Sequence, residues 1–264
     1  MAKDHGQRLQ QAAGEVARLR ASIGADAQMR AWTHALKNWQ AHRLARTHAD
    51  LLAEPRHGLA ARFFLQDLYG AKDFSQRDAE LARLVPMLVR LLPEAALATI
   101  ADAIEMDALS ERLDLAMATL VRESDPLAID EPAYADAYRR AGSRRDRERQ
   151  IELIATIGQS LDRLVRHPML GRLLEAMGGP ARVAGLSQMH DFLVRGFEAF
   201  RAIGGASAFL ARLETRERAI LEALYAGART GWAEQAAGAA GTRSDQGSQS
   251  TRGPASPQGP ASSS

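Results

Sequence analysis

The sequence contains no cysteine, and this absence excludes several kinds of site at once. A chain without thiols forms no disulfide, no thiolate nucleophile, no zinc–thiolate site and no cysteine-ligated iron–sulfur cluster. Lysine is also scarce, because only Lys3, Lys37 and Lys72 occur among 34 basic side chains. The formal net charge is only +2, since 32 acidic residues nearly balance the 34 basic ones. This balance argues against non-specific nucleic-acid binding as the protein's main task.

Long hydrophobic runs are missing as well. No segment approaches the roughly 20 apolar residues that are needed to span a membrane. The first residues, Met1–Arg8, lack the apolar centre of a signal peptide. We therefore expect a cytoplasmic protein with no membrane partner.

Recognised catalytic and cofactor-binding motifs are absent from the sequence. There is no His-Glu-x-x-His zinc motif, no Gly-x-x-x-x-Gly-Lys phosphate loop and no Gly-x-Ser-x-Gly nucleophile elbow. A ferritin-like di-iron centre needs repeated Glu-x-x-His motifs on helices. The one match, Glu54–His57, contains Pro55 and lies at a predicted helix break. We predict no metal and no cofactor.

Helical periodicity, in contrast, is present along most of the chain. Apolar residues recur at steps of three and four, for example at Ile151, Ile154 and Ile157, and no alternating strand pattern occurs. We predict an all-α protein with a single multi-helix, bundle-like domain over residues 7–226. Two prolines mark a connector that leaves an internal boundary near residues 125–131 as an alternative. Residues 227–264 are rich in Gly, Ala, Ser and Pro, which predicts a disordered C-terminal tail.

The most distinctive stretch is residues 62–70, Arg-Phe-Phe-Leu-Gln-Asp-Leu-Tyr-Gly. As a helix it is apolar over most of its circumference, with Phe63, Phe64 and Tyr69 contributing large rings, so neighbouring helices should enclose it. Asp67 projects between the two phenylalanines. Its carboxylate needs a partner, because an isolated buried charge is costly.

This stretch resembles the signature of the bacterial "FFLEELY motif" proteins, an uncharacterised helical family. Gln66 and Asp67 stand where that pattern has two glutamates. The later segments Arg166-His167-Pro168 and Gly178-Gly179-Pro180-Ala181-Arg182 are also similar to parts of that family, and the resemblance covers most of the chain up to about Gly227. It implies a helical fold and no known activity.

Two ionisable residues lie within apolar helical stripes. His48 falls among Leu44, Leu51 and Leu52, where it serves either as a base or ligand, or as a core histidine bonded to a backbone carbonyl. Glu217 falls in the stripe of residues 209–224. It is either a general acid or base, or a carboxylate paired with a nearby arginine. For that pairing the sequence suggests Arg195 or Arg182.

Three other polar side chains have a similar choice of roles. Asp67 either holds a substrate cation or forms an inter-helix ion pair, and Tyr69 either bonds a ligand or a buried polar group. His167 ends a helix, where it complements the helix dipole or binds an anion or a metal. A basic cluster offers either a nucleic-acid face or a salt-bridged helix start. Its members are Arg139, Arg140, Arg144, Arg145, Arg147 and Arg149.

These observations lead to two hypotheses about function. In the first, the protein is a non-enzymatic helical module that binds a protein or a small molecule and is built around the helix over residues 63–69. In the second, it is an enzyme or a haem-type sensor with a cavity inside the bundle. That cavity would be lined by His48, Asp67, Tyr69, His167 and Glu217, which must therefore converge. The candidate ligand-binding residues are His48, Phe63, Phe64, Asp67, Tyr69, His167 and Glu217.

Overall fold

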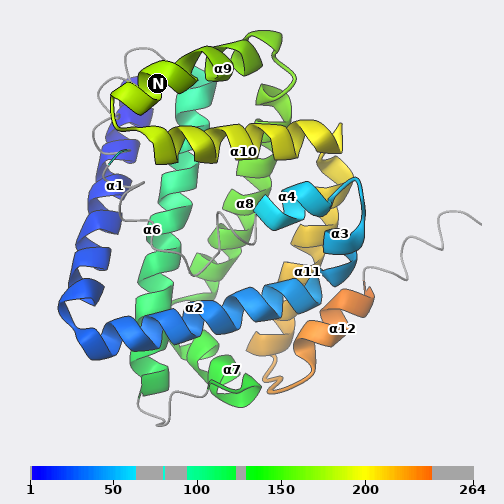
Figure 1. The fold of residues 1–264 in the computed structure, drawn as a ribbon. Helices are drawn as coiled ribbons and strands as arrows, with labels where there is room; N and C mark the ends of the chain where they lie inside the picture. The colour runs from blue at the N-terminus through cyan, green and yellow to red at the C-terminus, as the bar shows by residue number, and fades with distance from the viewer. Residues whose placement is uncertain (1, 64–79, 81–93, 123–128, 240–264) are drawn as a thin grey trace, which may run out of the picture.

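The computed structural model describes residues 2–63, 80, 94–122 and 129–239 (Figure 1). These residues contain eleven helices and no strand, which confirms the all-α prediction. The predicted aromatic helix begins within them but Phe64, Asp67 and Tyr69 lie outside the described residues. In chain order the helices are α1 (Ala2–Ala25), α2 (Ala27–Thr47), α3 (Ala49–Ala53), α4 (Gly58–Phe63), α6 (Glu94–Arg122), α7 (Glu131–Arg140), α8 (Arg144–Leu164), α9 (Pro168–Val183), α10 (Ser187–Ile203), α11 (Ser207–Tyr225) and α12 (Trp232–Ala239).

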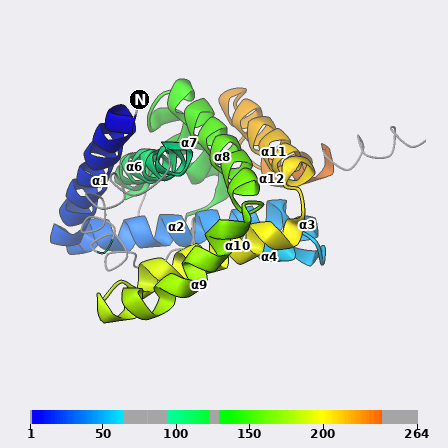
Figure 2. The same ribbon diagram turned by 90° about the horizontal axis from the view of Figure 1, so that it is seen from above.

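The helices are arranged in two crossing sets. Helices α1, α6, α8 and α11 stand side by side, as the two views together show (Figures 1 and 2). Helices α2 and α10 run across one side of this set at different heights, with α3 and α4 near one edge. Helices α7 and α12 lie at the lower end in Figure 1, close to α2 and α11. The crossing brings parts of the chain that are far apart in sequence to one central region.

Short local signals set the helix boundaries around that region. Asp26 caps α2 by accepting hydrogen bonds from the backbone N–H groups of Gln28 and Met29, at 2.9 and 3.1 Å. Ser143 and Asp146 form a reciprocal capping box at the start of α8. Helix α10 ends at Gly204, whose φ of 63° lies in the left-handed region that favours glycine.

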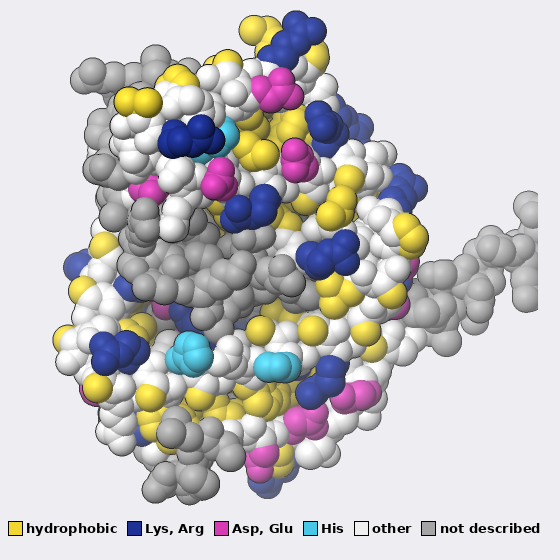
Figure 3. Space-filling model, in the orientation of Figure 1, with side chains coloured by type: hydrophobic (Ala, Val, Ile, Leu, Met, Phe, Trp, Pro, Cys, Tyr) yellow, Lys and Arg dark blue, Asp and Glu magenta, His cyan; other side chains and the backbone are white. Residues whose placement is uncertain are grey.

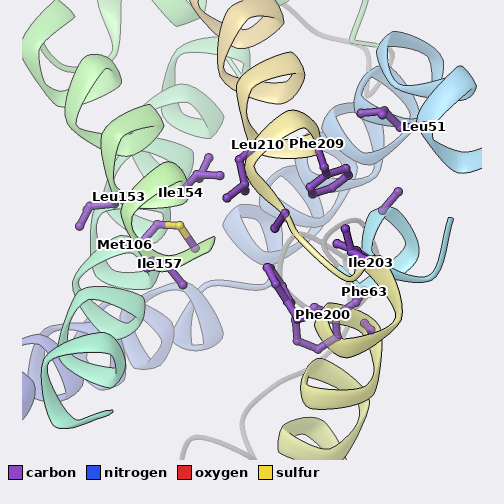
Figure 4. Packing of buried hydrophobic residues seen from close by; sticks show 14 of the residues in the cluster. Leu51, Phe63, Met106, Leu153, Ile154, Ile157, Phe200, Ile203, Phe209 and Leu210 are labelled. Atoms are coloured by element: carbon purple, nitrogen blue, oxygen red, sulfur yellow. The ribbon is translucent and has the colours of Figure 1, made fainter. Parts of the chain in front are cut away.

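Two hydrophobic clusters make up most of the core. The first joins α8, α10 and α11, and Figure 4 shows Ile154, Phe200 and Phe209 among its side chains. The second surrounds Tyr134 and Trp232 and joins α2, α6, α7, α11 and α12. Both clusters combine residues from before and after residues 125–131.

Ion pairs connect helices beside these clusters. Glu111 of α6 is almost fully buried and accepts hydrogen bonds from Arg20 of α1 and Lys37 of α2, at 2.9 and 2.6 Å. Arg216 of α11 donates two hydrogen bonds to Asp50, at 2.7 and 2.8 Å. Because each of these buried charges has its opposite partner, the pairs fix helix positions without leaving an uncompensated charge.

The ordered chain extends further than the sequence predicted. Helix α12 occupies Trp232–Ala239, within the segment predicted to be a disordered tail, and Trp232 is only 1% exposed. Trp232 packs against Tyr134, with ring centroids 5.7 Å apart. The predicted domain end at residue 226 is therefore too early, because one tryptophan gives the following small residues a core to join.

The surface carries scattered apolar side chains rather than a long apolar span. On the face shown in Figure 3, hydrophobic side chains lie among acidic and basic ones. Met169, Leu173 and Val183 of α9 are exposed. Within the described residues, no helix combines the length and the apolar character needed to cross a membrane.

Candidate functional site

A cavity of about 90 Å³ lies where the two crossing sets of helices meet. Its wall takes Leu51, Ile154 and Phe209 from the first hydrophobic cluster, and Tyr134 and Tyr138 from the second. The cavity therefore lies at the boundary between the two clusters. The other described residues that line it are Gln40, Arg43, Leu44, His48, Ala61, Ser110, Asp114, Arg147, Gln150, Ile151, Leu213 and Glu217.

Helical spacing explains how each element contributes to this wall. Residues three, four, seven or eight positions apart share one face of an α-helix. Helix α8 supplies positions 147, 150, 151 and 154, and α11 supplies positions 209, 213 and 217. Helix α7 supplies positions 134 and 138, and α6 supplies positions 110 and 114. The sequence therefore places these side chains on single faces, and the packing of the helices then brings the faces together.

One wall of the cavity is formed by the triad Arg43, His48 and Glu217. Arg43 Nη1 donates to both carboxylate oxygens of Glu217, at 2.7 and 2.8 Å. His48 Nε2 lies 2.9 Å from Glu217 Oε1, so the proton of this hydrogen bond is on Nε2 when the carboxylate is ionised. His48 reaches this position because it is the residue at which α2 ends and α3 begins.

The triad keeps a charged carboxylate in the interior. Burial alone raises the pKa of Glu217, but the charge of Arg43 and the hydrogen bond with His48 outweigh it and lower the pKa to about 2. Burial likewise favours the neutral form of Arg43, and attraction to Glu217 reverses this and raises its pKa. Arg43 and Glu217 are therefore an ion pair at neutral pH.

Arg147 also lines the cavity, and its interactions differ from those of Arg43. Its side chain is only 3% exposed, and its guanidinium carbon lies 4.1 Å from the centre of the Tyr138 ring. Its Nη2 donates to Met117 Sδ at 3.0 Å, and its Nε has no hydrogen-bond partner. Among the described residues no carboxylate pairs with it.

Asp114 is the acidic group that lines the cavity on the side of α6. Its side chain accepts a hydrogen bond from Gln40 Nε2 at 3.0 Å. Burial raises the pKa of Asp114, and the attraction to Lys37, the hydrogen bond with Gln40 and a weaker attraction to Arg147 only partly oppose this. Burial also raises the pKa of Tyr138, so its hydroxyl stays protonated at neutral pH. The cavity thus presents neutral donors and acceptors beside its charged groups.

The structure brings together two of the residues that the sequence singled out. His48 and Glu217, which are 169 positions apart, are hydrogen-bonded to each other and line the cavity. The expected partner of each is corrected, since Glu217 pairs with Arg43 instead of Arg195 or Arg182, and His48 bonds a carboxylate instead of a backbone carbonyl. Sequence spacing within one helix cannot show such contacts between helices.

Two other candidates, Phe63 and His167, are described and do not line this cavity. Phe63 is buried beneath α10, where its ring lies 5.4 Å from that of Phe192. His167 is exposed at the start of α9, and its side chain makes no capping hydrogen bond. Phe64, Asp67 and Tyr69 lie outside the described residues.

The sequence assigned Arg147 to a surface cluster, and this assignment is wrong. Other arginines of that cluster do form surface ion pairs, as Arg144 does with Glu148 and Glu222, and Arg149 with Glu105. Arg147 lies four residues before Ile151, on the apolar face of the same helix. That spacing was the available signal that this one arginine points inward.

The cluster of acidic and histidine residues needed for a metal ion is not found here. Within the described ranges, no group of three or more such side chains could hold a metal. His48 and Glu217 form a pair whose other close neighbour is the guanidinium of Arg43.

Comparison with known families places most of the bundle in one group. The family description that matches is "Domain of unknown function (DUF8198)", and the match extends over residues 19–231. The chain belongs to the DUF8198 family. The matched range contains every described residue that lines the cavity of this DUF8198 protein. No curated protein and no solved structure matches the chain.

Proposed function

We propose that this protein binds a small polar molecule in the cavity between its two hydrophobic clusters. The main support is that the cavity wall contains buried polar side chains whose hydrogen-bonding groups are not all paired within the protein. Arg43 Nε, His48 Nδ1 and Arg147 Nε are buried and have no hydrogen-bond partner among the described residues. Because buried polar groups are almost always hydrogen-bonded, such a wall suits a bound polar guest.

The polar lining of the cavity supports a binding site rather than a packing defect. A packing defect is usually lined by apolar side chains and stays dry. This wall instead contains two arginines, a histidine, two carboxyl groups and two tyrosines. Seven helices contribute to it, so a guest that fits would connect elements from α2 to α11. We also propose that the protein is cytoplasmic. A relationship to the bacterial FFLEELY proteins, based on the likeness of residues 63–70 to their signature, is a further part of the proposal.

Ligand-observed NMR with a panel of small polar molecules tests the proposal. We expect saturation transfer to at least one of them, with a dissociation constant of about 5 mM or tighter. Leu213→Phe adds volume inside the cavity and should abolish that signal. Leu120→Phe, at a half-buried leucine outside the cavity, is the matched control and should retain it. Binding that is equal in both variants would place the ligand elsewhere, and no binding to the parent protein would refute the proposal.

A further inference from the structure

The charges, the shape and the volume of the cavity narrow the class of ligand. We propose that the ligand is a short-chain monocarboxylate, with its carboxylate beside Arg147 and its apolar tail toward Ile154 and Phe209. This inference rests on the proposed function, since it assigns a chemical class to the molecule in the same cavity.

The charge of the ligand follows from a comparison of buried arginines. Arg43 and Arg216 each have a carboxylate partner, with hydrogen bonds of 2.7 and 2.8 Å in both cases. Arg147 is equally buried, but with the described residues its guanidinium forms a hydrogen bond to a sulfur and a contact with an aromatic ring, and no ion pair. A buried charge without an opposite partner is costly, so one negative charge beside Arg147 is the missing complement.

A single negative charge fits better than two. The charge of Glu217 is already balanced by Arg43, and Asp114 is hydrogen-bonded to Gln40 rather than paired with Arg147. Among the described residues that line the cavity, Arg147 is therefore the cation with no carboxylate in ion-pair contact. A dianion such as hydrogen phosphate would bring a second charge into the interior with no partner for it. Arginine is also suited to carboxylates, because its planar fork matches their geometry.

The apolar tail follows from the orientation of α8 and α11. These helices are antiparallel, since Arg144 pairs with Glu222 near one end and Gly158 approaches Leu210 near the other. Arg147 and Glu217 consequently lie toward the first end of the cavity, and Ile154 and Phe209 toward the second. Along α8, seven residues at 1.5 Å each separate the two ends by about 10 Å. The cavity is thus charged at one end and apolar at the other.

The volume limits the length of the ligand. An apolar cavity of about 150 Å³ holds benzene, which has six non-hydrogen atoms. By proportion, the 90 Å³ cavity holds about four, which is the size of acetate. Propionate, with five non-hydrogen atoms, is close to this limit, whereas butyrate and longer fatty acids exceed it.

Calorimetric titration of the full chain compares a charged ligand with its neutral isostere. We expect propionate to bind with a dissociation constant between about 0.05 and 5 mM, the range open to so few atoms. Propionamide, which has the same shape and no charge, should bind at least about tenfold more weakly because it leaves Arg147 uncompensated. Inorganic phosphate should also bind more weakly than propionate. Equal affinity for propionate and propionamide, or tighter binding of phosphate, would overturn the assignment.

A pair of arginine variants locates the carboxylate. Arg147→Met keeps a long side chain over Tyr138 and removes the charge, so propionate affinity should fall at least about tenfold. Arg145→Met removes an exposed arginine two positions away and should leave the affinity unchanged. Undiminished propionate binding in a folded Arg147→Met protein contradicts the inference. If that variant does not fold, the comparison of propionate with propionamide on the parent protein still decides.

The two proposals fail in different ways. Binding of other small molecules to the parent protein but not to Leu213→Phe, with no binding of any carboxylate, would support the proposed function and refute the assignment of a monocarboxylate ligand. If nothing binds to the parent protein, both fall.

Discussion

Replacing Glu217 by glutamine removes one negative charge from the cavity wall while keeping the shape of the side chain. Its carboxylate accepts two hydrogen bonds from Arg43 and one from His48, and its side chain is only 12% exposed. Removing one partner of a buried ion pair costs about 3–5 kcal/mol, because the other charge is left uncompensated. The amide still accepts a hydrogen bond, so we expect Glu217→Gln to cost about 3 kcal/mol.

The pKa of Glu217 gives a second route to the same magnitude. The folded protein lowers this pKa from 4.5 to about 2. Each unit corresponds to about 1.4 kcal/mol, so the carboxylate contributes roughly 3 kcal/mol to the free energy of unfolding at neutral pH. For a domain of this size, about 2–4 °C of Tm accompany each kcal/mol, which predicts a decrease of about 6–12 °C for the variant.

The pH dependence provides the sharper test. Because the pKa of Glu217 is lower in the folded protein than in the unfolded chain, its contribution is complete above about pH 4.5 and is lost as the pH falls toward 2. By pH 3 roughly two-thirds of it has gone. The difference in Tm between the parent protein and Glu217→Gln should therefore shrink between pH 7 and pH 3, as measured by circular dichroism.

Glu214 supplies the matched control on the same helix. It pairs with Arg218 one turn away at 3.0 Å, at the surface, with 45% of the arginine side chain exposed. Glu214→Gln should change the free energy of unfolding by no more than about 0.5 kcal/mol at any pH. A Glu217→Gln effect as small as that of Glu214→Gln, or one that stays constant down to pH 3, would refute the account of the triad.

Two further substitutions test packing and capping near the site. Gly196→Ala places a Cβ 2.8 Å from the Phe63 ring, so the free energy of unfolding measured in urea should fall by about 1–3 kcal/mol. In the control Gly179→Ala the new Cβ meets no atom within 4 Å, so this variant should be neutral or slightly stabilising. A larger loss for Gly179→Ala than for Gly196→Ala would contradict the close packing of α4 against α10. Ser143→Ala removes the serine side chain from the capping box of α8 and should lower the free energy of unfolding by about 1 kcal/mol in the same assay. Ser143→Thr keeps a hydroxyl at this position and should retain most of that stability. An alanine variant as stable as the parent protein would show that the cap is dispensable.

Periodicity in the sequence predicts the helices of this protein and their buried faces, because it arises within single helices. The repeat of apolar residues three and four positions apart predicts α8 and α11. The inward placement of His48 and Glu217 follows from the same pattern, since each lies in an apolar stripe. Helix α12 was less readable from the sequence, because it depends on the contact of Trp232 with a distant core.

Only the tertiary structure decided which inward side chains meet. The pairing of Arg43 with Glu217 crosses 174 positions, and nothing within either helix specifies it. The same holds for Arg147. The other arginines of its segment, such as Arg145 and Arg149, are exposed, whereas Arg147 is buried against Tyr138 and Met117. The sequence by itself determined the helices and the face of each that is buried, because local spacing and hydrophobicity suffice for that. Which faces pack against each other, and which buried charge is left without a partner, depends on the crossing of α2, α8 and α11, and therefore on interactions between residues far apart in the chain.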